Sequence, residues 1–221
     1  MLPLRDVIPS RTTPYITVVI IVLNALGWFF ELSMPREQLS VFLQQWGVVP
    51  AAFIPSTLFS SMFLHGSWSH EIGHMWSLWI FGDNVEDRMG HGRFIVFYLL
   101  CGLVAAFGQM ALDPSSSVPM IGASGAIAGV MGGYFVLYPQ SRVLTLIPLI
   151  IIWEIIELPA IVLLGFWFLM QLFSAGAIAV TAGAGSGGGG VAFMAHVAGF
   201  VAGMGAVLVF RKKQPPTEWM Y

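Results

Sequence analysis

GASGA, residues 122–126, opens an apolar segment that ends near Tyr138, and AHVAG, residues 195–199, lies near the start of a second one. Each motif carries one polar side chain that can do chemistry, Ser124 in the first and His196 in the second. Polar groups inside hydrocarbon are costly unless they have partners, so they mark candidate functional sites. Because serine and histidine are the minimum set for a base-activated nucleophile, Ser124 and His196 are the candidate catalytic pair.

The composition is that of a protein embedded in a lipid bilayer. Of the 221 residues, 57% are hydrophobic and 9% are charged, whereas soluble domains carry roughly 25% charged residues. The formal net charge is −2, so we expect no nucleic-acid partner. The single cysteine, Cys101, lies in an apolar segment. A single cysteine cannot form an intrachain disulfide, and we expect Cys101 to pack as a small buried hydrophobic side chain.

Windows of about twenty residues predict six membrane-spanning helices. Their expected limits are 16–33, 68–83, 94–112, 123–138, 158–174 and 191–210. Residues 143–153 are also apolar, but Pro148 and the nearby Glu154 and Glu157 argue against a further span. We expect a reentrant or interfacial segment there.

The basic residues predict how the bundle is oriented. With six spans and the N-terminus inside, eight of the nine lysines and arginines fall on the cytoplasmic side and only Arg36 falls outside, as the positive-inside rule favours. The eight are Arg5, Arg11, Arg88, Arg93, Arg142, Arg211, Lys212 and Lys213. The expected organisation is a cytoplasmic segment over residues 1–15, an all-α membrane domain over 16–210 and a cytoplasmic tail over 211–221.

This topology brings polar residues of three spans to one depth. Spans two, four and six all run from outside to inside, so the histidines of span two, His70 and His74, lie level with the catalytic pair. Span four is short, because about fifteen helical residues cover roughly 22 Å of a hydrocarbon core of roughly 30 Å. Its outer end must then stop inside the membrane, which places Ser124 in a recess that water has to reach.

Small residues predict that spans four and six pack closely. Three stripes repeat a small residue at every fourth position, which is how membrane helices bring their backbones together. The stripes are Ser124, Ala128 and Gly132; Gly125, Gly129 and Gly133; and Ala195, Gly199 and Gly203. Close approach matters because a serine passes its proton to an imidazole over about 2.6–3.2 Å. Neither span contains an acidic residue to orient His196, which predicts a dyad and not a Ser-His-Asp triad.

At these residues the chain resembles the rhomboid family of intramembrane serine proteases. The matching motifs are FLHG at 63–66, GDNVED at 82–87, GASGA at 122–126 and AHVAGF at 195–200. The resemblance covers nearly all of the chain, from about residue 10 to about residue 212. It implies a six-span rhomboid-like bundle with a short central fourth helix.

The resemblance implies a role for each residue of the site. Ser124 would be the nucleophile and His196 the base. Gly122 would shape the oxyanion site, and His70 and the backbone amide of Ser124, at a helix N-terminus, would donate to it. His74 stands where rhomboids usually carry asparagine and would replace the amide donor with an imidazole N–H.

Three further expectations follow from the resemblance. Glu86 would anchor the loop between spans one and two, over residues 34–67. That loop, with Trp46, would lie half-immersed beside the bundle. The glycine-rich stretch 181–190 would belong to a mobile cap before span six, although a featureless linker explains its composition equally well.

Two positions of span two depart from the family. Glu71 stands where rhomboids usually carry an apolar residue, and together with His70 and His74 it completes the HExxH pattern of zinc metalloproteases. That pattern places two ligands on one helical face with a carboxylate to activate water. In a zinc site His70, His74 and His196 would bind the metal and Glu71 would be the base, with His65 as another possible third ligand.

The expected function is that of an intramembrane serine endopeptidase that needs no cofactor. It would bind single-span membrane proteins from the lipid bilayer and cut their helices near the outer end. One alternative is a zinc-dependent intramembrane protease that uses HExxH. The other is a non-catalytic rhomboid-like protein that binds membrane proteins. The absence of a transit peptide favours a prokaryotic plasma membrane, with both termini in the cytoplasm.

Overall fold

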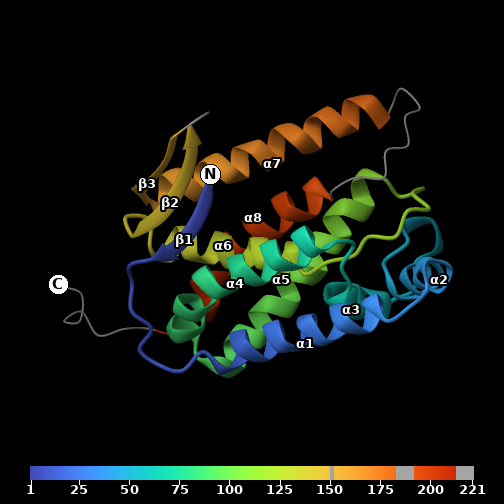
Figure 1. Cartoon of the computed structure of the whole chain (residues 1–221), viewed down its shortest axis with the longest axis horizontal. Helices are drawn as coiled ribbons and strands as arrows, with labels where there is room; N and C mark the ends of the chain where they lie inside the picture. The colour runs from blue at the N-terminus through green and yellow to red at the C-terminus, as the bar shows by residue number, and fades with distance from the viewer. Residues whose placement is uncertain (150–151, 183–191, 213–221) are drawn as a thin grey trace.

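Six long helices run through the residues that the computed structural model describes, which are 1–149, 152–182 and 192–212 (Figure 1). They are α1 (Tyr15–Leu32), α4 (Trp68–Met89), α5 (His91–Leu112), α6 (Ser124–Leu137), α7 (Ala160–Ala182) and α8 (Phe193–Phe210). Each overlaps one predicted span, although α4 and α7 extend beyond the predicted C-terminal limits. Four of them, α1, α5, α7 and α8, are long and apolar enough to cross a membrane, and α6 is a shorter apolar helix. The predicted helical membrane fold is therefore confirmed, while the count of six spans stays a prediction because α4 is more polar.

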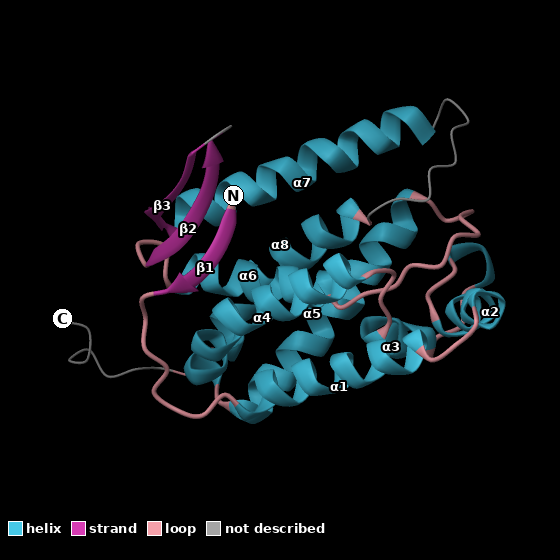
Figure 2. Ribbon diagram, viewed as in Figure 1, coloured by secondary structure: helices cyan, strands magenta, loops and turns pink. Residues whose placement is uncertain are grey.

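A three-stranded antiparallel sheet lies at one end of the bundle, beside α7 (Figure 2). Its strands are β1 (Leu2–Asp6), β2 (Arg142–Leu149) and β3 (Ile152–Pro159), in the order β1-β2-β3. The all-helical prediction did not include this sheet, and most of the segment expected to be reentrant or interfacial, 143–153, lies in the β2–β3 hairpin. A short apolar run fits a strand as well as a buried helix, and β-branched residues such as Val143 and Thr145 favour the strand.

Short helices fill the connection between α1 and α4. They are α2 (Arg36–Trp46), η1 (Pro50–Ala52), α3 (Thr57–Ser60) and η2 (Ser61–Phe63). Val48 and Met120 exchange backbone hydrogen bonds of 3.0 and 2.8 Å, which ties this connection to the segment before α6. Trp46 and Val41 are exposed, as a loop half-immersed in lipid requires, but its depth in a membrane stays a prediction.

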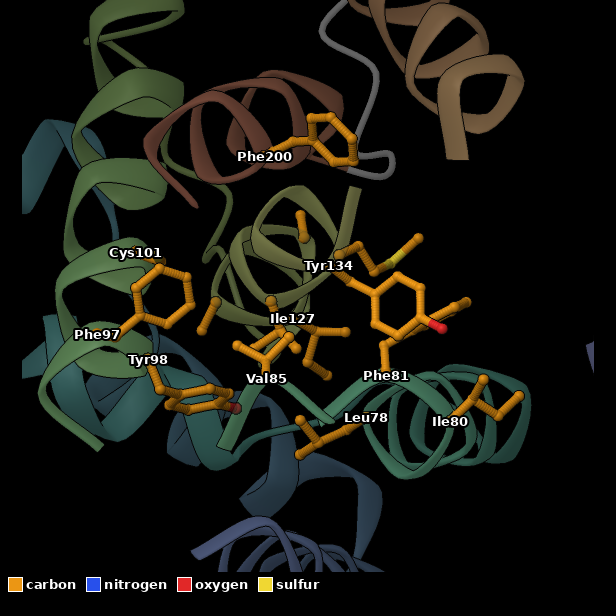
Figure 3. Close-up of a cluster of buried hydrophobic side chains, with 14 of the residues drawn as sticks. Leu78, Ile80, Phe81, Val85, Phe97, Tyr98, Cys101, Ile127, Tyr134 and Phe200 are labelled. Atoms are coloured by element: carbon orange, nitrogen blue, oxygen red, sulfur yellow. The ribbon is translucent and has the colours of Figure 1, made fainter. Parts of the chain in front are cut away.

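Helix α6 forms the centre of the bundle, with every residue buried from Gly125 to Tyr134. Aromatic side chains of the surrounding helices close around it (Figure 3), and the rings of Phe81 and Tyr134 meet edge to face at 5.0 Å. Helix α8 packs on α6 so closely that a Cβ on Gly203 would lie 1.9 Å from the Gly129 oxygen. The close packing predicted from the small-residue stripes is confirmed.

Two buried carboxylates, Glu86 and Glu31, accept backbone hydrogen bonds near the ends of α1. Glu86 accepts hydrogen bonds from the first-turn amides of α1, Ile16 at 3.0 Å and Thr17 at 2.8 Å, where Pro14 offers no capping side chain. The expectation that Glu86 anchors the loop over 34–67 is therefore wrong, because its partners lie at the start of α1. The buried Glu31 serves that loop instead, accepting from the backbone N–H of His65 at 3.1 Å.

Candidate active site

Ser124 is the first residue of α6, in a position set by the turn before it. Gly122 has a φ of +115°, which L side chains rarely adopt, and its N–H donates to the Ser61 oxygen at 2.8 Å. The amides of the first helical turn, including that of Ser124, have no acceptor inside the helix. A half-buried hydroxyl therefore sits beside backbone donors that favour negative charge.

His196 lies in the first turn of α8, and its side chain contacts a residue of α7. Its Nδ1 lies 2.7 Å from Oε1 of Gln171. A carbonyl oxygen only accepts, so Nδ1 carries the proton and Nε2 keeps a free lone pair, the form that a general base needs. The Trp167 ring, one helical turn before Gln171, packs on the imidazole with centroids 5.9 Å apart.

The sequence-based prediction missed Gln171 because it considered only acidic residues of spans four and six as partners for His196. A signal was present, since Gln171 is a polar side chain in an otherwise apolar segment, and a polar group inside hydrocarbon needs a partner. The predicted absence of an acidic partner on α6 and α8 agrees with the sequence of both helices. The orienting group is a neutral amide from a third helix.

Ser124 and His196 stand on helices in direct contact. A Cβ on Gly199 would lie 2.1 Å from the oxygen of Gly125, and these glycines are close neighbours of the catalytic pair in sequence. Among the hydrogen bonds of the described residues, none joins the Ser124 hydroxyl to His196. Catalytic hydrogen bonds are often long before substrate binds and tighten only in the complex.

A small pocket opens beside Ser124. Its volume of about 30 Å³ lies between α5, α6, α8 and the loop before α6, and its lining includes Ser61, Gly122 and Ser124. A volume of this size corresponds to about one water molecule. The structure thus has a recess beside Ser124 with room for the water that hydrolysis consumes, and the position of this recess inside a membrane stays a prediction.

Three histidines gather on the other side of Gly122. The ring centroids of His70 and His74 lie 4.2 Å apart, and His65 lies 5.2 and 5.0 Å from them. A Cβ on Gly122 would meet both the His70 and the His74 ring at 3.0 Å. Both rings are also within electrostatic reach of His196. The structure therefore brings His70, His74 and Gly122 together with the two catalytic candidates.

The histidine cluster does not have the geometry of a zinc site. Nε2 of His65 and Nδ1 of His74 face each other at 2.8 Å, whereas two nitrogens on one tetrahedral zinc lie about 3.3 Å apart, given Zn–N distances of about 2.0–2.1 Å. Within the described part of the chain, no three His, Cys, Asp or Glu side chains are arranged to hold a metal ion. Glu71, the base of the zinc alternative, instead contacts His65 at 2.9 Å.

Known proteins show similar sequences. Residues 54–213 match the family model of the Rhomboid domain. YdcA of Bacillus subtilis is 27% identical over 129 residues, which cover 56% of this chain and 62% of YdcA. The rhomboid protease GluP of the same organism is 34% identical over 85 residues, 38% of this chain and 16% of GluP.

Rhomboid protein 1 of Saccharomyces cerevisiae, a mitochondrial protein, is 26% identical over 109 residues, 47% of this chain and 32% of the relative. The chain thus spans less than two thirds of the length of these relatives. The family match nevertheless covers most of the chain, from the loop before α4 to the end of α8. The chain belongs to the rhomboid family, which includes intramembrane serine proteases.

Proposed function

We propose that this protein is a serine endopeptidase that cleaves the transmembrane segments of single-span membrane proteins through Ser124 and His196, without a cofactor. The observation that carries the proposal is the state of His196. Gln171 occupies its Nδ1 at 2.7 Å, so the remaining ring nitrogen can accept a proton. That base stands on the helix that packs directly against the start of α6, where the serine lies.

The chemistry follows from these positions. Nε2 of His196 takes the hydroxyl proton as Ser124 Oγ attacks the scissile carbonyl, and it then gives that proton to the leaving amine. The oxyanion forms beside the Ser124 amide, with His70 and His74 as the facing donors across Gly122. Water then attacks the acyl-enzyme, His196 takes its proton, and Oγ leaves as the regenerated hydroxyl.

We propose the predicted topology for the whole chain: a cytoplasmic segment over 1–15, six spans over 16–210 and a cytoplasmic tail from 211. Arg88 lies within electrostatic reach of Arg11 and Arg211 at one end of the bundle. Arg36 begins α2, which lies at the far end from the sheet (Figure 1). This separation of charge supports a cytoplasmic position for the sheet end. The membrane that we propose is a prokaryotic plasma membrane.

Two expectations concern residues outside those described. The proposed cap over 181–190 falls almost entirely on residues 183–191, and most of the proposed tail falls on residues 213–221.

The experiment is cleavage of a single-span substrate by the purified protein in liposomes. Ser124→Ala and His196→Ala should each abolish cleavage, while the matched control Ser115→Ala, in the loop before α6, should not change the rate. Full cleavage by Ser124→Ala would overturn the proposal. Loss of activity on chelation with recovery on adding zinc would support the metal alternative, and binding of the substrate without cleavage would support the non-catalytic one.

A further inference from the structure

The first strand of the sheet, β1, is joined to α7 through the β2–β3 hairpin. It pairs with β2, with Leu2 opposite Leu146 and Asp6 opposite Val143. Strand β3 of the hairpin ends at Pro159, and α7 begins at the next residue. In the folded chain β1 lies between α7 and α4 (Figure 1). The strand is therefore placed to connect these two helices.

On its other side β1 is bound to α4 and α6. The indole N–H of Trp76, in the middle of α4, donates to the backbone oxygen of Pro3 at 2.6 Å. The carboxyl group of Asp6 accepts from the Asn84 amide at 2.8 Å and from the Tyr134 hydroxyl at 2.7 Å. Because Trp76 and Asn84 are about two helical turns apart, the strand runs along α4 with a hydrogen bond at each end.

A cavity of about 230 Å³ lies beside β1, between α4 and α7. Residues of β1, α4, α6 and α7 line it, including Pro3 of the strand and Trp167 of α7. The Trp167 ring also packs on the imidazole of His196, with centroids 5.9 Å apart. A single side chain thus connects the cavity with the catalytic base.

The helices on the other sides of the catalytic pair are in close contact. A Cβ on Gly108 of α5 would lie 2.5 Å from the Ala198 Cβ of α8, and a Cβ on Gly125 of α6 would lie 2.3 Å from the Ala105 Cβ of α5. Helix α8 packs on α6 just as closely. These three helix pairs leave no room for another chain, whereas α4 and α7 face each other across the cavity.

The cavity is too small to hold a substrate helix. An α-helix with its side chains is about 10–12 Å wide and rises about 5.4 Å per turn, so one turn occupies roughly 400–600 Å³. Helices α4 and α7 must therefore separate before a membrane-spanning segment can lie between them. Separation breaks the hydrogen bonds of β1 to α4 or to β2, because the strand joins α4 to the hairpin that leads into α7.

We propose that residues 1–6 form an autoinhibitory strap, which holds α4 and α7 together and keeps membrane-spanning substrates from the catalytic pair until it detaches. The effect on cleavage rests on the proposed function, whereas the opening of the cavity does not. Trp76 is 41% exposed and Asn84 is 1% exposed. Release of the strap should therefore begin at the Trp76 end.

The first test weakens the strap. Trp76→Phe removes the indole N–H and keeps an aromatic ring. Since the net free energy of one hydrogen bond shifts an equilibrium by about two- to tenfold, we expect kcat/KM for a single-span substrate in liposomes to rise by that factor. Trp79→Phe, at an exposed position of the same helix, is the matched control. A value for Trp76→Phe equal to or below that of the control would overturn the proposal.

The second test locks the strap to α4. A short bifunctional maleimide would join Pro3→Cys to Trp76→Cys, and Cys101 does not compete because it is 1% exposed. Cross-linking should abolish most cleavage of the spanning substrate, while a fluorophosphonate still labels Ser124 at the same rate, because the small probe needs no separation of α4 and α7. Each single-cysteine variant, treated with the same reagent, is the control. Unchanged cleavage, or an equal loss of cleavage and labelling, would overturn the proposal.

The third test reads the opening without any catalysis. Leu163 lines the cavity and is 5% exposed, so a lipid-soluble maleimide should modify Leu163→Cys faster when Trp76→Phe is also present. Equal rates of modification would overturn the strap. If the rates differ as expected but no variant cleaves a spanning substrate and Ser124 does not react with fluorophosphonate, the proposed function fails instead.

Discussion

Replacing Gly199 by alanine tests whether the contact between α6 and α8 sets the catalytic geometry. The new Cβ would lie 2.1 Å from the backbone oxygen of Gly125, whereas a carbon and an oxygen in contact lie about 3.3 Å apart. The obstructing atom is backbone inside a helix, so no side chain can move aside. The two helices must therefore separate by roughly 1 Å.

The separation acts directly on the reacting atoms. Gly125 follows Ser124 in α6, and Gly199 lies one turn after His196 in α8. Since a displacement of about 1 Å costs about 100-fold in rate, we expect kcat to fall about 100-fold. The overpacked interface should also lose about 1–3 kcal/mol of stability.

The assay compares kcat, per mole of folded protein, for cleavage of a single-span substrate in liposomes. Gly205→Ala is the matched control, because a Cβ at that position of the same helix meets nothing within 4 Å. Thermal unfolding and gel filtration establish that both variants are folded. A Gly199→Ala variant as active as Gly205→Ala would refute the argument that helix contact sets the distance between serine and histidine.

Three other substitutions test separate parts of the structure. Gln171→Leu should lower kcat by about tenfold or more with little change in substrate binding, because the ring of His196 loses the bond that keeps Nε2 free; equal kcat in the two proteins would show that Gln171 does not orient the base. Glu86→Ala should destabilise the fold by about 1–3 kcal/mol, the cost of leaving the buried N–H groups of Ile16 and Thr17 without an acceptor, and unfolding in denaturant with an unchanged midpoint would contradict this. Burial raises the pKa of Asp6 to about 6, against the opposing bond from the Tyr134 hydroxyl. The folded state therefore holds a proton that the unfolded state has lost, so this group lowers stability as the pH rises from about 4 to about 6, and Asp6→Asn should reduce that slope in melting experiments.

Helix limits were predictable where hydropathy alone decides them. Spans one, four and six were placed within a few residues of α1, α6 and α8, because lipid requires an apolar surface whatever the tertiary contacts. Span two was predicted to end at residue 83, but α4 continues to Met89. Its last turns are polar, and they remain helical because Glu86 and Asp87 accept hydrogen bonds from the N-terminal segment.

The residues of the candidate site could be predicted from the sequence, but the side-chain contacts between them could not. Repeating glycines indicated which helices meet, and shared depth indicated that His70 and His74 lie near Ser124. The contact that sets the polarity of the His196 ring, from Gln171, joins α7 and α8 through side-chain rotamers. No periodicity in the sequence encodes those rotamers. The β2–β3 hairpin was missed for a similar reason, because its strands are stabilised by pairing and not by a pattern of their own.

Mass-spectrometric mapping of a fluorophosphonate probe shows whether Ser124 and His196 act as a catalytic pair. We expect the purified protein to carry a single phosphonyl group on Ser124 and His196→Ala not to react, because the hydroxyl is nucleophilic only with its base. Labelling of a different residue, or unchanged labelling of Ser124 in His196→Ala, would contradict it.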